Sequence, residues 1–217
     1  QYRHNSGTDR RIDPSPTNII DMYVLTESYN KSYREYLKDK SGKMLEPEKP
    51  TMLDMTVQYN ELENLKSISD SITYSPANFK ILFGKKAPQE LQATFKVVRV
   101  RNSQISNAEI RTRVIETINE YFNIDNWDFG DTFFFSELGA YIHNELVQEI
   151  GSIVIVPTTS SQNFGDLFQI TSEANEIFVS AATVDDVEIV DSVTATELRS
   201  NTTVNIFGGF TPTTLRT

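Results

Sequence analysis

The 217-residue chain contains no cysteine and only two histidines, and this scarcity excludes several kinds of site. Without cysteine there can be no disulfide framework, no thiol nucleophile and no cysteine-ligated zinc or iron–sulfur centre. No apolar run approaches the roughly 18 residues that a membrane-spanning helix needs. The remaining composition, with 38% hydrophobic and 23% charged residues, is that of a globular protein with a hydrophobic core. We therefore expect a soluble protein.

Basic residues are absent from a long internal stretch. Residues 114–198 contain none of the 20 lysines and arginines but 16 of the 30 acidic residues, although the net charge of the whole chain is only −10. An acidic surface repels phosphate, so we expect no nucleic acid and no anionic membrane as partners. Two explanations stay open, namely solubility alone, or an acidic face that docks on a basic face of another copy or of a different partner.

The sequence pattern divides the chain into four parts and predicts an α+β fold. An extended arm at 1–16 precedes a strand and helix segment at 17–75, which contains a polar, proline-bearing linker at 38–50. A compact α+β module occupies 76–191, and a threonine-rich extended arm forms 192–217. The chain begins at Gln1 without an initiator methionine or a signal pattern, so either processing has removed a leader or, as we expect, the chain is a piece of a longer polypeptide.

Two helices and one strand are predicted in the segment 17–75. Apolar alternation predicts a strand near 19–25, and Thr26 can cap a following helix. The apolar face of that helix is predicted to bury Tyr29, Tyr33 and Leu37. A second, short helix is predicted from the capping-box pattern of Asn60 and Glu63, with the apolar residues Leu62, Leu65, Ile68 and Ile72.

The module 76–191 is predicted to pack amphipathic helices on one face of a mixed sheet. Alternation over 93–97 that changes phase at Val98 predicts a strand with a bulge. The first helix is predicted to start after Ser106 and to bury Ile110, Val114, Ile118 and Phe122. The second is predicted to open at Ser136, to bury Leu138, Ile142, Leu146 and Ile150, and to stop at Gly151. Further strands are predicted at 152–157, 167–171, 176–180 and 187–190.

A search for catalytic and metal-binding patterns predicts no catalytic residue, metal site or cofactor. His143 lies on a helix without the second histidine of a zinc-protease motif, and no nucleophile elbow or P-loop is present. Asp125, Asp128 and Asp131 recur at three-residue spacing, which differs from the alternate-residue ligands of a calcium loop. They favour a turn with Trp127 and Phe129 as anchors, although a carboxylate-based enzyme or a calcium-dependent binding module remains the alternative. Phe133, Phe134 and Phe135 favour a strand that is buried on both faces.

Three segments of the sequence resemble a known family. Residues 10–26 (RRIDPSPTNIIDMYVLT), 81–91 (ILFGKKAPQEL) and 126–138 (NWDFGDTFFFSEL) resemble the baseplate wedge proteins of T-even-type contractile-tailed bacteriophages. The stretch 106–156 is similar more broadly to the baseplate J-like family, in which this module is a tail structural protein.

The resemblance implies a structural role in the virion and no catalytic residues. Wedge proteins of this kind form homodimers or higher self-associated states, bind other wedge proteins and link wedges into a ring around the tail hub. The resemblance also implies that this chain is the C-terminal portion of a longer protein, located in the tail baseplate and assembled in the cytoplasm of the bacterial host. Because its apolar residues favour adding a strand to a sheet edge, the C-terminal arm is expected to contribute interface residues, namely Ile206, Phe207 and Phe210. The linker 38–50 is a candidate hinge.

Overall fold

The computed structural model describes four stretches of the chain, 18–59, 70–100, 104–158 and 169–190. They form an α+β fold with mixed strand pairing, which confirms the predicted fold class. The chain divides into two compact units, 1–78 and 79–217. The sequence pattern placed this division after residue 75. The predicted arms 1–16 and 192–217 lie outside the described residues.

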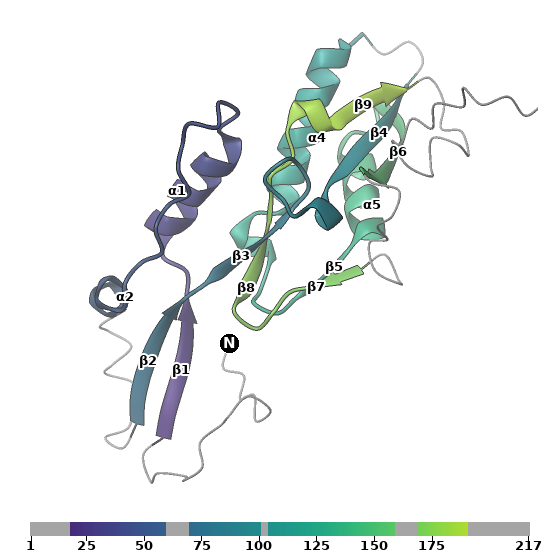
Figure 1. The fold of residues 1–217 in the computed structure, drawn as a ribbon. Coiled ribbons are helices and arrows are strands. Elements are labelled where there is room, and N and C mark those ends of the chain that lie inside the picture. The colour runs from purple at the N-terminus through teal and green to yellow at the C-terminus, as the bar shows by residue number, and fades with distance from the viewer. Residues whose placement is uncertain (1–17, 60–69, 101–103, 159–168, 191–217) are drawn as a thin grey trace, which may run out of the picture. The chain divides into compact units, whose positions relative to one another are not determined.

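The first unit contains a parallel strand pair and two helices (Figure 1). Strand β1 (Asn18–Val24) pairs with β2 (Asp70–Pro76), and the helices are α1 (Glu27–Lys38) and α2 (Met52–Gln58). The predicted capping of α1 is confirmed, because the Thr26 hydroxyl accepts a hydrogen bond from the Tyr29 backbone N–H at 3.3 Å. The predicted core residues Tyr29, Tyr33 and Leu37 are buried. A second small core consists of Val24, Met55 and Tyr74.

Two features of the first unit differ from the sequence prediction. Ile72 was expected on a helix but lies in β2, where it pairs with Ile20 of β1. The remaining residues of that predicted helix, including Asn60 and Glu63, lie outside the described residues. Helix α2 was not predicted, although a capping box starts it, in which the Thr51 hydroxyl accepts from Asp54 N–H at 3.3 Å and Asp54 Oδ2 accepts from Thr51 N–H at 3.0 Å.

The second unit is built on a three-stranded mixed sheet with the order β6–β4–β9. Strand β4 (Ala93–Arg99) is antiparallel to β6 (Ile150–Pro157) and parallel to β9 (Val187–Val190). Strand β3 (Asn78–Leu82) pairs with β8 (Glu176–Ser180), and β5 (Thr132–Phe134) is antiparallel to β7 (Gln169–Thr171). The helices are α4 (Asn107–Tyr121) and α5 (Phe135–Glu145) (Figure 1).

Aromatic rings fill the centre of the second unit. Phe83 is fully buried, and four rings surround it with centroid distances of 5.0 to 6.1 Å, namely Phe95, Phe122, Phe133 and Phe135. All four contacts are edge-on, the arrangement that the ring quadrupole favours. Val97 of β4 packs in the same core as Val114 of α4 and Ile142 of α5. One alternate face of β4 therefore belongs to the core that both helices cover.

Most predicted elements of this unit are confirmed. The register of β4 shifts between Val98 and Arg99, at the predicted bulge. Helix α4 starts with the Ser106 cap and buries Ile110, Val114, Ile118 and Phe122, as predicted. The strands predicted at 152–157, 176–180 and 187–190 are present, as is the end of the one predicted at 167–171.

The ends of helix α5 were predicted incorrectly. It begins at Phe135 and stops at Glu145, so Ile150 and Gly151 belong to β6 instead of to the helix and its stop. The reason is a tight turn, in which the Leu146 carbonyl accepts hydrogen bonds from the N–H groups of Glu149 and Ile150, both at 2.9 Å. The run of three phenylalanines is correspondingly divided between β5 and α5.

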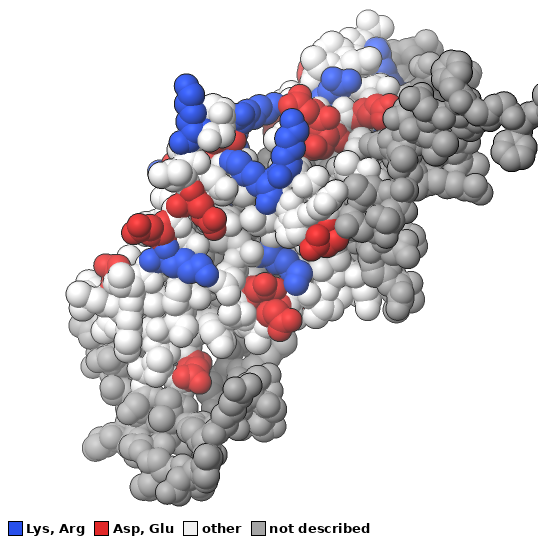
Figure 2. All heavy atoms as spheres, in the orientation of Figure 1, with Lys and Arg blue, Asp and Glu red and all other residues white. Residues whose placement is uncertain are grey.

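Ion pairs join the two charge regions of the sequence within the second unit. Three ion pairs join a cation from residues 80–113 to a carboxylate from the stretch that lacks basic residues, namely Lys80–Glu176 at 3.1 Å, Lys96–Glu188 at 3.4 Å and Arg113–Glu149 at 2.6 Å. Figure 2 shows basic and acidic side chains interspersed over the described residues of the face it views. Part of the charge asymmetry of the sequence is therefore neutralised inside the fold.

Candidate functional site

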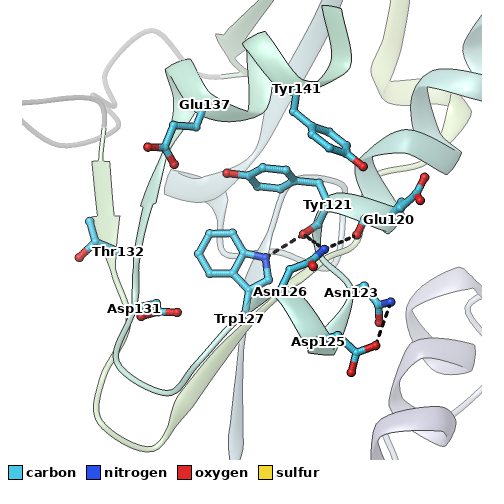
Figure 3. A pocket seen from close by; sticks show the side chains of 10 residues that line it. All are labelled: Glu120, Tyr121, Asn123, Asp125, Asn126, Trp127, Asp131, Thr132, Glu137 and Tyr141. Atoms are coloured by element: carbon cyan, nitrogen blue, oxygen red, sulfur yellow. Dashed lines mark hydrogen bonds between the residues drawn. The ribbon is translucent and has the colours of Figure 1, made fainter. Parts of the chain in front are cut away.

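A pocket of about 590 Å³ lies at the C-terminal end of α4, between this helix, α5 and the turn that connects them (Figure 3). It is lined by Glu120, Tyr121, Asn123, Asp125, Asn126, Trp127, Asp131, Thr132, Glu137 and Tyr141. Four of these ten residues carry a carboxylate, three are aromatic, and none is basic. We refer to this set of residues as the acidic–aromatic pocket.

The floor of the pocket forms because side chains of the turn cap the end of α4. The last carbonyl groups of a helix have no partner within the helix and need donors from elsewhere. The Trp127 indole N–H donates to the Tyr121 carbonyl at 2.9 Å, and the Asn126 amide donates to the Glu120 carbonyl at 3.0 Å. These two bonds fix the turn against the helix and hold the indole in the pocket (Figure 3).

The aromatic walls are continuous with the core. Trp127 stacks on the buried Phe122 with a centroid distance of 5.6 Å and an interplanar angle of 12°. It also meets Tyr121 edge-on at 5.6 Å, and Tyr121 lies 5.3 Å from the ring of Tyr141. Because each of these rings is packed against neighbouring rings, the aromatic surface of the pocket is preformed.

The four carboxylates come from three different elements. Glu120 is on α4, Asp125 and Asp131 are in the turn, and Glu137 is in the first turn of α5. Asp131 also holds the turn, because its Oδ2 accepts the Asp128 backbone N–H at 2.7 Å. Among the described residues, none of the four lining carboxylates forms an ion pair.

The tyrosines of the pocket are held in the neutral form. Burial and the nearby Glu137 carboxylate raise the pKa of Tyr121 to about 12. Burial, together with the negative charges of Glu120 and Glu145, also raises the pKa of Tyr141. Both phenols therefore stay protonated at neutral pH, and their rings add no negative charge to that of the carboxylates.

The electrostatics of the pocket favour a cationic ligand. The C-terminal end of a helix carries partial negative charge, and α4 ends at this pocket. Aromatic ring faces attract cations through their quadrupole, and carboxylates do so through their charge. No histidine, lysine or arginine lines the pocket, and its one hydroxyl from a serine or threonine, that of Thr132, lies 3.1 Å from the Thr171 hydroxyl. The lining of the pocket is therefore chemically suited to a positively charged group.

The structure brings together two of the three aspartates that the sequence singled out. Asp125 and Asp131 line the pocket, whereas Asp128 does not. Within the described stretches, no group of three or more His, Asp or Glu side chains could hold a metal ion. His143 is half-buried on α5 outside the pocket, and its Nδ1 has no hydrogen-bond partner among these residues.

The remaining predicted site residues, Ile206, Phe207 and Phe210, lie outside the described residues. Sequence reasoning missed Glu120, Tyr121, Glu137 and Tyr141 as members of one site. Their signal was present in two patterns, since Glu120 and Tyr121 end one predicted helix, while Glu137 and Tyr141 lie four residues apart on the next. Four-residue spacing places two side chains on one helix face.

Comparison with known proteins gives no assignment, because no family model and no curated protein matches this sequence. None of the helices in the described part of the chain is both long enough and apolar enough to cross a membrane.

Proposed function

We propose that the protein is a structural subunit of the baseplate of a contractile phage tail. In this proposal it acts through self-association and through contacts with other wedge proteins, and it links wedges into a ring around the hub. The single observation that carries the proposal is the resemblance of 10–26, 81–91 and 126–138 to the wedge proteins. The protein is then a component of the virion and has no catalytic role.

Two features of the structure support a role in protein binding. The segment 126–138, which resembles the wedge proteins, contributes five residues to the acidic–aromatic pocket, namely Asn126, Trp127, Asp131, Thr132 and Glu137. The segment 81–91 contains Phe83, which lies at the centre of the aromatic core, so this segment is part of the rigid core that supports the pocket. A binding site on a rigid support is suited to fixing the geometry of an assembly.

Light scattering of the purified chain across a concentration series, at low and at high salt, tests the proposal. We expect a dimer or a larger species whose mass depends on concentration, and salt should weaken it if charge contributes to the contact. Co-expression with the other wedge proteins of the same phage should yield a complex of defined stoichiometry. A strict monomer at every concentration that also fails to form such a complex would overturn the proposal.

A further inference from the structure

We propose that the acidic–aromatic pocket binds the guanidinium group of an arginine side chain that a partner protein supplies. The inference rests on the proposed function only in taking that partner to be a neighbouring subunit of the assembly. The recognition itself depends on the charge and the aromatic surface of the pocket.

The carboxylates of the pocket form no ion pair within the described residues, whereas three other carboxylates of the second unit do. In the second unit, Glu149, Glu176 and Glu188 each pair with a basic side chain from residues 80–113. The pocket carboxylates Glu120 and Glu137 are exposed and form no hydrogen bond or ion pair through their side chains with other described residues. A cation bound in the cavity would give these carboxylates an oppositely charged partner.

The aromatic surface selects a flat cation. Guanidinium is planar, is weakly hydrated compared with ammonium, and stacks on aromatic faces, whereas the lysine ammonium is compact and strongly hydrated. The rings of Tyr121, Trp127 and Tyr141 are held in fixed positions by edge-on, stacked and tilted contacts. A planar group can lie against such a surface and keep its N–H donors at its edge.

The carboxylates of the pocket are distributed around its aromatic rings. Figure 3 shows Glu137 and Asp131 on one side of the Tyr121 and Trp127 rings, and Glu120 and Asp125 on the other. Arginine carries five N–H donors in a rigid plane and can bond carboxylates at two edges, while lysine has a single charged point. The neutral phenol of Tyr121 lies on the same side as Glu137 and can accept a further hydrogen bond.

A titration of the full chain with N-acetyl-arginine amide tests the assignment directly. Trp127 is the only tryptophan, so its indole N–H gives one assignable cross-peak in a ¹H–¹⁵N NMR spectrum. We expect this peak and the backbone amides of 123–132 to move with saturation in the millimolar range, about 1 mM corresponding to a typical weak ligand. The matched lysine derivative should bind several-fold more weakly, and the citrulline derivative, which has the same shape without the charge, should not bind.

Charge-neutral variants locate the site. Glu137→Gln should weaken binding about threefold, and Glu120→Gln combined with Glu137→Gln about tenfold, since each removes one exposed charge contact. Glu116→Gln is the matched control, because Glu116 is an exposed residue of α4 that does not line the pocket, and it should leave the affinity unchanged. The dispersion of the same spectra shows whether each variant is folded.

Any of four results would overturn the inference: no saturable shift, equal binding of the citrulline derivative, equal binding of the lysine derivative, or equal weakening by Glu116→Gln. A failed titration together with self-association in light scattering would remove only this site and leave the proposed function standing. If the chain bound arginine but stayed monomeric and formed no complex, the pocket would stand as an arginine site and the proposed function would be overturned.

Discussion

Replacement of Gly84 by alanine should destabilise the second unit strongly. Gly84 follows β3 with a φ of +67°, and Phe83 before it also has a positive φ, of 62°. A Cβ at position 84 would lie 2.0 Å from the Ala181 carbonyl oxygen and 2.6 Å from its carbonyl carbon. Real Cβ atoms essentially never approach a neighbour within 3.0 Å, so the end of β8 has to move by about 1 Å or more.

The cost of this movement can be estimated from two contributions. An alanine in the left-handed region costs about 1–2 kcal/mol. The movement also pulls Ala181 N–H away from the Leu82 carbonyl, to which it donates at 2.9 Å, and both residues are buried. Leaving a buried donor or acceptor without a partner costs about 1–3 kcal/mol. We therefore expect Gly84→Ala to lose about 2–5 kcal/mol of a total stability that is typically about 5–15 kcal/mol.

Urea unfolding followed by the fluorescence of Trp127 measures this loss, because the only tryptophan lies in the second unit. Gly139→Ala is the matched control, since Gly139 lies in α5 and an added Cβ would meet no atom within 4 Å. Alanine favours helix, so this variant should gain about 0.5–1 kcal/mol. If Gly84→Ala unfolded within about 0.5 kcal/mol of the unchanged protein, in the range of ordinary surface substitutions, the argued clash and strain would be refuted.

Three further predictions follow from the charged groups. The pKa of Tyr121 is raised to about 12 in the folded state, so its contribution to stability is complete below the unfolded pKa near 10 and is lost as pH rises toward 12. Glu137→Gln should lower this pKa only part of the way, because burial is the larger cause of the shift and remains in the variant. A pH titration of the Tyr121 ring followed by ¹³C NMR measures the pKa. A double-mutant cycle with Arg113→Met and Glu149→Gln should give a coupling of about 1 kcal/mol, because the atoms lie 2.6 Å apart and the Glu149 side chain is 12% exposed; a coupling of zero would contradict the pairing. Calcium should leave the melting temperature unchanged, whereas an increase would revive the calcium-dependent alternative, since a ligand specific for the folded state stabilises it.

Local signals made helices α1 and α4 and several strands predictable. The caps of α1 and α4 use Thr26 and Ser106, each followed by apolar residues at four-residue spacing, and both helices start where those caps predict. The bulge in β4 was visible because a one-residue insertion changes the alternation of apolar side chains. In each case the residues that determine the feature lie close together in the sequence.

Elements that depend on distant partners could not be predicted in this way. Strand β2 contains serine, threonine and tyrosine, and its parallel partner β1 is about fifty residues earlier in the sequence. Its helix-like apolar spacing from the preceding residues led to the wrong assignment of Ile72. The end of α5 was missed for a related reason, because Leu146 and Ile150 continue the helical spacing although the chain turns into β6 between them.

The acidic–aromatic pocket depends both on local sequence signals and on contacts between segments that are distant in the sequence. The sequence singled out Asp125, Asp131 and Trp127 but not Glu120 and Glu137. The convergence of these side chains depends on α4 and α5, which pack in the same aromatic core. The fold also changes the meaning of the long stretch without basic residues. Ion pairs with Lys80, Lys96 and Arg113 neutralise three of its carboxylates, while those beside Trp127 have no such partner in the described part of the chain. Four of the carboxylates that these ion pairs leave unneutralised therefore line one pocket, beside aromatic rings that can bind a cation.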